Sequence, residues 1–304
     1  MILFLEQLLN GLQFGVMLFL MASGLTLVFG IMNLVNLAHG SFYMIGAFVA
    51  AAIVASSGSF VLGLLGALLA TAILGIAVEM LIFRVLYKRD HLEQILATFG
   101  IILFCNEAVQ VIWGKTPLFF DIPAALSGSV ELLPGLNYPL FRIGVIGVGI
   151  VVAVFLYLLI NRTRLGMAIR AGSSDREMIA ALGVNIKLLY SLVFGLGALL
   201  AALAGVMAGP ILSVESGMGE SILILTFVVI VIGGIGSIKG ALAGAVLVGV
   251  VDTLGRAFMP ELMRMALSGG AADSMGATLS SILIYLLMAV VLIFRPRGLF
   301  NANH

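Results

Sequence analysis

The chain has 304 residues, of which 62% are hydrophobic and 10% are charged, and its formal net charge is +1. A soluble domain is about 25% charged and about half apolar, so the composition excludes an ordinary soluble fold and predicts an all-α polytopic membrane protein. The apolar runs are continuous and not alternating, which excludes an outer-membrane barrel. The near-zero charge and the lack of a basic tail give no indication of a nucleic-acid partner. The single cysteine, Cys105, excludes an intrachain disulfide.

A transmembrane helix needs about 20 apolar residues. Some neighbouring runs are hard to divide, so we expect eight to ten such helices in one membrane domain, residues 1–304, embedded in the lipid bilayer. The candidates lie at 8–30, 38–56, 60–83, 94–112, 141–160, 188–211, 221–238, 240–257 and 279–294.

Ten of the fifteen Lys and Arg residues fall within 84–89, 162–187 and 295–297. The positive-inside rule predicts that all three clusters are cytoplasmic. An even number of candidate helices separates each pair of clusters, as this requires. Three candidates precede Arg84, so we expect the N-terminus outside and the C-terminus inside. The segments 113–140, 212–220 and 258–278 are then expected to be external.

The longest polar interruption, residues 161–187, contains the pattern of a short helix. Ser174-x-x-Glu177 reads as a capping box that begins the helix, and Gly183 is placed to end it. Such a helix in a basic cytoplasmic loop is suited to docking another protein; the alternative is a solvated loop with a frayed helix. Its apolar edge consists of Met178, Ile179 and Leu182.

Residues 30–41 are unusually polar for a stretch between two apolar runs. In lipid, such groups face the bundle interior or a watery cavity. A helix broken between Gly30 and Gly40 is the kind of element that lines a translocation path, whereas the alternative is interhelical hydrogen bonding alone. If the stretch is helical, one face presents Asn33, Asn36 and Gly40. The candidate path residues here are Asn33, Asn36, His39, Gly40 and Ser41.

A second Gly-rich stretch, residues 233–240, predicts another helix break. Its Lys239-Gly240 echoes His39-Gly40, as in transporters with internal repeats. We add Gly234, Gly236 and Ser237 to the candidate path.

Acidic residues within the candidate helices are few. Glu79 lies about a turn from Arg84, so either snorkelling or pairing at the inner surface is expected. Glu107 and Asp252 lie towards the predicted outer ends, whereas an ion-driven carrier more often has carboxylates at mid-depth. The chain contains no metal-ligand or nucleophile–base cluster, so we expect neither a metal site nor an enzyme.

Several blocks together resemble one family, the permease subunits of branched-chain amino-acid ABC importers of the LivH type. The resemblance covers residues 8–300. The blocks that carry it are Asn10-Gly-Leu, 24–40, 162–171 with 180–185, 233–240 and 295–300.

The resemblance implies partners: a LivM-type second permease, two cytoplasmic ATPases and a periplasmic binding protein, in a bacterial cytoplasmic (inner) membrane. It implies no cofactor on this chain, with ATP and Mg bound by the ATPases. It also implies alternating access, with branched-chain amino acids as the first choice of substrate and urea, short amides or aromatic acids as alternatives. A stand-alone carrier or a channel remains the alternative of a different class. The residues that the resemblance assigns to ATPase coupling are Arg170, Ser174, Asp175, Glu177, Met178, Ile179, Ala181, Leu182 and Gly183.

Overall fold

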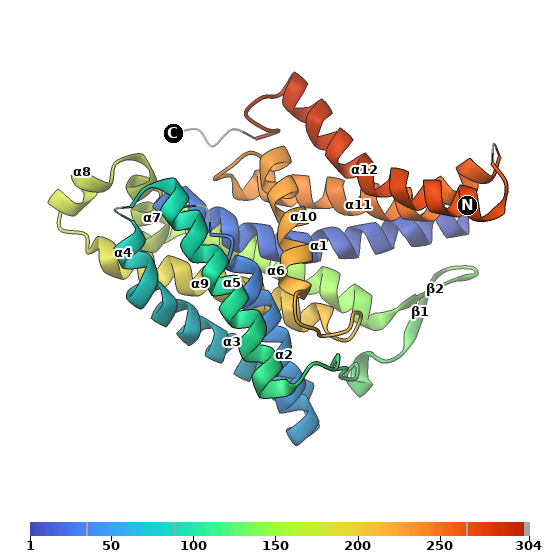
Figure 1. Cartoon of the computed structure of the whole chain (residues 1–304), viewed down its shortest axis with the longest axis horizontal. Coiled ribbons are helices and arrows are strands. Elements are labelled where there is room, and N and C mark those ends of the chain that lie inside the picture. The colour runs from blue at the N-terminus through green and yellow to red at the C-terminus, as the bar shows by residue number, and fades with distance from the viewer. Residues whose placement is uncertain (35, 88, 266, 301–304) are drawn as a thin grey trace.

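A computed structural model describes residues 1–34, 36–87, 89–265 and 267–300. Val35, in the polar stretch 30–41, and Lys88, in the basic cluster 84–89, lie outside the described residues. The elements, drawn in Figure 1, are α1 (Ile2–Met32), α2 (His39–Ser57), α3 (Phe60–Val78), the π-helix η1 (Glu79–Phe83), α4 (Arg84–Leu86), α5 (His91–Trp113), the 3-10 helix η2 (Ala124–Leu126), β1 (Ser129–Leu133), β2 (Leu136–Pro139), α6 (Leu140–Arg162), α7 (Arg164–Ser174), α8 (Arg176–Ala181), α9 (Ile186–Ala208), α10 (Met218–Gly233), α11 (Ile238–Arg264) and α12 (Gly269–Phe294).

The structure confirms the all-α polytopic fold. In the described residues, eight helices are long and apolar enough to cross a membrane, and α10 is a shorter apolar helix of 16 residues. Together they occupy the nine predicted runs. Most of segment 258–278 is helical, because α11 continues to Arg264 and α12 begins at Gly269.

The core lies around α1 and α9, whose most apolar windows are each 83% buried. Small residues allow α1 and α11 to approach closely in antiparallel directions. A Cβ on Gly11 would lie 2.7 Å from the Cα of Val250, and one on Gly15 would lie 2.8 Å from the carbonyl oxygen of Ala245. By contrast, α3, α5, α6 and α12 expose many large apolar side chains, as expected for helices in contact with lipid or a partner subunit.

Both predicted helix breaks are present. The first follows α1, where Asn33 takes the left-handed conformation with φ 53°. Residues 33, 34 and 36–38 are not helical, so the condition under which Asn33, Asn36 and Gly40 would share one helical face is not met. The second break follows α10 at Gly234, with φ 104°, and α11 begins after Ser237, whose hydroxyl accepts a 3.1 Å hydrogen bond from the Gly240 N–H.

The segment 295–300 packs against the second break. The N–H groups of Leu299 and Phe300 donate to the carbonyl oxygens of Ile232 and Gly233, at 2.8 and 2.9 Å. These two hydrogen bonds hold Gly298 against Gly234. A Cβ on Gly298 would lie 2.5 Å from the Gly234 Cα. The sequence blocks 233–240 and 295–300 therefore pack together as one structural unit.

The basic clusters gather at one end of the bundle, which we call the basic end: the α4 and α7–α8 region with segment 295–300 (Figure 1). The antiparallel β1–β2 hairpin lies at the opposite end, the hairpin end. There Leu118 and Val214 exchange two backbone hydrogen bonds of 2.9 Å, so the segments 113–140 and 212–220 contact each other.

Candidate translocation and coupling site

A cavity of about 960 Å³ opens at the basic end. Its walls come from α1, α6, α7 and the loop that joins α10 to α11. It brings together residues that the sequence placed in two separate groups. Asn33, Gly236 and Ser237 come from the candidate path, and Arg170 and Ser174 come from the candidate coupling segment.

The other candidate path residues lie away from this cavity. Asn36 and His39 are 0% and 1% exposed, and both side-chain amide atoms of Asn36 and Nε2 of His39 have no hydrogen-bond partner among the described residues. Gly40 packs so tightly on α10 that a Cβ would lie 2.2 Å from the Gly219 carbonyl oxygen. Ser41 is buried beside it. The first turns of α2 and α10 are therefore in backbone contact and leave no space for a solute between them.

Gly234 is also buried and does not line the cavity. Its backbone lies against segment 295–300, where a Cβ would meet the Phe300 carbonyl oxygen at 2.2 Å. Its place is therefore structural in this conformation, whereas its neighbours Gly236 and Ser237 face the cavity.

The coupling segment forms two helices, α7 and α8. The Asp175 carboxylate caps α8, since its Oδ1 accepts hydrogen bonds from the backbone N–H groups of Glu177 and Met178, at 3.0 and 2.9 Å. The predicted capping box that begins at Ser174 is wrong, because Ser174 is the last residue of α7 and Asp175 takes the cap position.

The prediction that Gly183 ends the short helix is confirmed. Gly183 has φ 87°, and its N–H donates to the Ala180 carbonyl while the Val184 N–H donates to the Ile179 carbonyl. These two bonds form a Schellman motif, which leaves α8 a compact and well-terminated helix.

The apolar edge of α8 is partly buried and partly exposed. Ile179 is 5% exposed and packs on the bundle, whereas Met178 and Leu182 are 61% and 76% exposed. The remaining coupling candidates Arg170, Glu177 and Ala181 are also exposed. The Arg170 guanidinium donates to the Ile160 carbonyl, which ties α7 to the end of α6.

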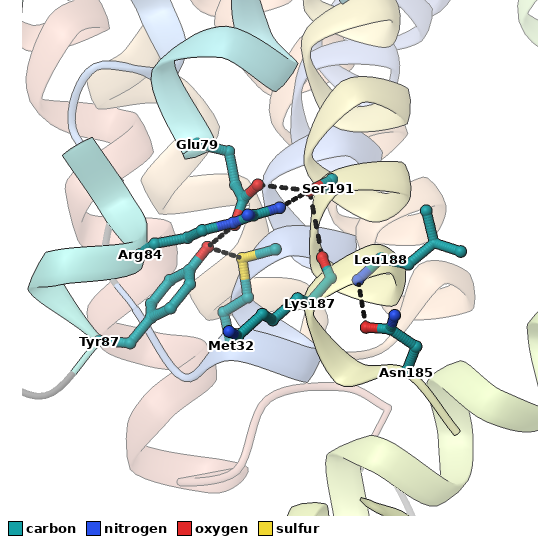
Figure 2. Close-up of polar contacts among 8 residues, drawn as sticks. All are labelled: Met32, Glu79, Arg84, Tyr87, Asn185, Lys187, Leu188 and Ser191. Carbon is teal, nitrogen blue, oxygen red and sulfur yellow. Dashed lines mark hydrogen bonds and ion pairs between the residues drawn. The ribbon is translucent and has the colours of Figure 1, made fainter. Parts of the chain in front are cut away.

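A buried polar cluster lies beside this segment (Figure 2). Glu79 is 0% exposed and pairs with Arg84, with 3.4 Å between Oε1 and Nε. The predicted pairing is confirmed. The π-helix η1 contains the five residues from Glu79 to Phe83, and a π-turn aligns residues five apart, as Glu79 and Arg84 are.

Two further side chains complete the cluster, and the local sequence pattern did not indicate either of them. The Ser191 hydroxyl donates to Glu79 Oε2 at 2.5 Å and accepts from Arg84 at 2.8 Å. The Tyr87 hydroxyl donates to Glu79 Oε1 at 3.1 Å. Burial, followed by the nearby Glu79 carboxylate, holds the pKa of Tyr87 above its ordinary value, so this hydroxyl remains a donor.

The cluster ties the end of α3 to the first turns of α9, directly after the coupling segment (Figure 2). Ser191 also lies 3.1 Å from the Lys187 carbonyl oxygen, within α9. In the described residues, no group of three or more His, Cys, Asp and Glu side chains is placed to hold a metal ion. What the arrangement offers is a cavity, two helix breaks and a fixed surface helix.

These features define a multi-pass membrane permease: a helical bundle with interrupted helices and a cavity at one end. Comparison with known proteins gives the family. The family model for the branched-chain amino acid transport system permease component matches residues 7–292, and the chain belongs to this family.

Similar proteins include the high-affinity branched-chain amino acid transport system permease protein BraD of Pseudomonas aeruginosa, 33% identical over 97% of this chain and 95% of BraD. LivH of Escherichia coli, a permease protein of the same kind of system, is 30% identical over 84% of this chain and 87% of LivH. A fructose import permease protein, FrcC of Rhizobium meliloti, is 39% identical over 36% of this chain and 34% of FrcC. No solved structure matches the chain.

Proposed function

We propose that this permease is the membrane subunit of an ATP-driven importer that carries branched-chain or similar hydrophobic amino acids across the bacterial inner membrane. The names of BraD and LivH support the substrate class. The partners are a LivM-type permease, two cytoplasmic ATPases that bind ATP and Mg, and a periplasmic binding protein. The basic end faces the cytoplasm, by the positive-inside rule.

One observation carries the ATPase assignment: Met178 and Leu182 are exposed on a helix whose two ends are both fixed. A single apolar residue on a surface needs no explanation, but two on one edge of a capped helix at the basic end form a small docking surface. In this proposal, α8 sits in a groove of an ATPase subunit, with Met178 and Leu182 as its anchors.

Motion of the ATPases passes to the membrane domain through α7. This helix joins α8 directly, and its residues Ile169, Arg170 and Ser174 form part of the cavity wall. ATP-driven displacement of α8 therefore changes the wall of the cavity. Because the backbones of α2 and α10 touch at Gly40 and Gly219, these helices must separate if a solute is to pass between them.

The binding protein docks at the hairpin end. The bonded segments 113–140 and 212–220 form a continuous surface there, and Val214 connects it to the loop that leads into α10. Docking of the binding protein outside and ATP-driven closure of the ATPases inside favour the same global state of the importer. The two events are therefore coupled in free energy. Substrate selection is left to the binding protein, so urea, short amides and aromatic acids remain alternative substrates for the same machinery.

The proposal is tested by placing a charge on the exposed edge of α8. Met178→Asp and Leu182→Asp should each reduce ATP-dependent leucine uptake at least tenfold in vesicles that contain the complete importer. ATP hydrolysis should then no longer respond to the loaded binding protein. Burying a carboxylate in a docking groove is costly, which is the physical reason for the expected loss.

Two controls separate docking from a general effect of surface charge. Met178→Leu retains the apolar contact and should retain transport. Met265→Asp changes a methionine that is 86% exposed on the loop after α11, away from α8, and should also retain transport. Full uptake in both α8 variants would remove the coupling assignment, and uptake by the chain alone without ATP would identify a carrier or a channel instead.

A further inference from the structure

The lining of the cavity at the basic end has an unbalanced charge. Three cationic side chains, Arg170, Arg176 and Lys239, contribute to it, and its described lining contains no Asp or Glu. They come from α7, from the start of α8 and from the start of α11. The charge is therefore assembled by the fold and is not a single run of basic residues.

The three cations are also not neutralised by carboxylates elsewhere. Every ion pair within the part of the chain that the structure describes involves other basic residues. Arg170 donates to the Ile160 carbonyl oxygen, and the Lys239 Nζ lies 6.0 Å from the centroid of the Tyr157 ring. Neither contact removes the positive charge, so the cavity attracts anions.

The rest of the cavity is suited to a hydrocarbon chain. Its inner wall consists of apolar residues of α1, α6 and α11, among them Leu27, Leu156 and Leu242. Polar side chains interrupt this wall, among them Tyr157, Asn161 and Thr26. Thr26 is 3% exposed, and its Oγ1 has no hydrogen-bond partner among the described residues. Thr26 is seven residues from Asn33, the residue that follows α1, which corresponds to about 10 Å along the helix.

From this geometry we infer that the cavity binds an anionic phospholipid of the cytoplasmic leaflet. The phosphate lies among Arg170, Arg176 and Lys239, an ester oxygen of the lipid accepts from the Thr26 hydroxyl, and the acyl chain follows the apolar wall. Basic pockets between transmembrane helices at the cytoplasmic side are suited to such headgroups. The inference rests on the proposed orientation of the protein, because only then does the cavity lie at the level of that leaflet.

A transported amino acid fits the same cavity less well. Its carboxylate could pair with the cations, but its ammonium group would find no carboxylate in the described lining. A cavity of about 960 Å³ is also large for a leucine-sized solute. A lipid bound here would join α7 and the first residue of α8 to α11, and so hold the coupling segment against the second helix break.

The test measures lipid binding directly, without transport. The intact importer is purified in nanodiscs that contain equal amounts of phosphatidylglycerol and phosphatidylethanolamine, and the lipid retained by this subunit is identified by native mass spectrometry. Phosphatidylglycerol should be enriched. Lys239→Gln should reduce the enrichment about fivefold, and Arg176→Gln together with Lys239→Gln by more than tenfold, because each cation near a headgroup contributes about 1 kcal/mol.

Lys187→Gln is the matched control, since Lys187 is an exposed cation at the same end but does not line the cavity. It should leave the enrichment unchanged. As a second readout, a photoactivatable phosphatidylglycerol should label peptides from 153–161 and 235–242 in the unmodified importer, which needs no variant to fold.

Equal retention of the two lipids, or an equal loss in the Lys187→Gln control, would overturn the inference. Displacement of the lipid by millimolar leucine would also overturn it and assign the cavity to the substrate. The lipid result does not depend on whether α8 couples to an ATPase, so failure here and failure of the proposed function are distinguishable.

Discussion

A fully buried carboxylate is the most demanding residue in this protein. Taking Glu79 out of water is costly unless its charge is paired and its oxygens are hydrogen-bonded. Arg84 supplies the charge, and Tyr87 and Ser191 supply two further donors. The cluster therefore joins residues 79–87 to Ser191 in α9 through charge-paired and hydrogen-bonded side chains.

We predict that Glu79→Gln lowers the free energy of unfolding by about 2 kcal/mol. Loss of one partner of a buried pair costs about 3–5 kcal/mol, and the 31% exposure of the Arg84 side chain reduces this cost. The measurement is the unfolding temperature in mild detergent. Glu93→Gln is the control, because its pair with Arg89 is more than half exposed on both sides and should contribute less than about 1 kcal/mol. Equal shifts in the two variants would contradict the role given to burial.

At the scale of elements, the two helix breaks differ in how they are held. The break after α1 ends in a left-handed Asn33 on the cavity wall. The break after α10 is covered by segment 295–300, with Gly234 and Gly298 in backbone contact and both at positive φ. A side chain at either glycine would meet both a strained backbone and an occupied space.

We therefore predict that Gly298→Ala and Gly234→Ala each release segment 295–300. The measurement is the rate of trypsin cleavage after Arg297, which should rise at least tenfold in both variants. Gly147→Ala is the matched control, since nothing lies within 4 Å of a Cβ at this helical position, and it should leave cleavage unchanged or stabilise the protein slightly. Normal cleavage in both glycine variants would show that their contact does not hold the segment.

The elements could be predicted wherever the determining signal is local. Long apolar runs indicated the membrane helices, and Gly183 and the Gly-rich stretch 233–240 indicated a helix end and a helix break. The position of a cap was harder, because Ser174 and Asp175 are both good caps and the choice depends on how far α7 extends. Pro260 lies inside α11, which continues through it, and it packs closely on Gly276 of α12.

The candidate site was predictable only in part, because its geometry depends on contacts between distant residues. Ser191 is 112 positions from Glu79, and no local pattern relates them. Nor does the sequence place Arg170 beside Gly236 on one cavity. Polarity alone also could not distinguish Asn33, which lines the cavity, from Asn36, which is buried away from it.

For the whole molecule, the decisive feature is that residues of all three basic clusters lie at one end of the bundle. Arg84 contacts Ser191 in α9, and segment 295–300 packs on the end of α10, which leads into the cavity loop beside Arg170. Charge asymmetry of this kind sets the orientation of a polytopic protein during insertion. The three basic clusters thus lie on one side of the bundle, as the charge rule requires.

We predict that the basic end is cytoplasmic and the hairpin end periplasmic. In a variant with Cys105→Ala, a cysteine is placed either at Leu132 in β1 or at Glu177 in α8, both of which are exposed. A membrane-impermeant thiol reagent should label Leu132→Cys in intact spheroplasts, and Glu177→Cys only after permeabilisation. The reverse pattern would invert the topology, and with it the proposed direction of transport.

The contact between segment 295–300 and the second helix break also has a consequence in time. The ribosome makes about 5–20 residues per second, so the residues that cover Gly234 emerge roughly 3–13 s after it. During that interval, the carbonyl oxygens of Ile232 and Gly233 lack the partners that they have in the finished protein. The cavity loop is therefore completed late in biosynthesis, after α11 and α12 have been made, and a nascent chain stopped before Leu299 lacks the bonds that fasten it.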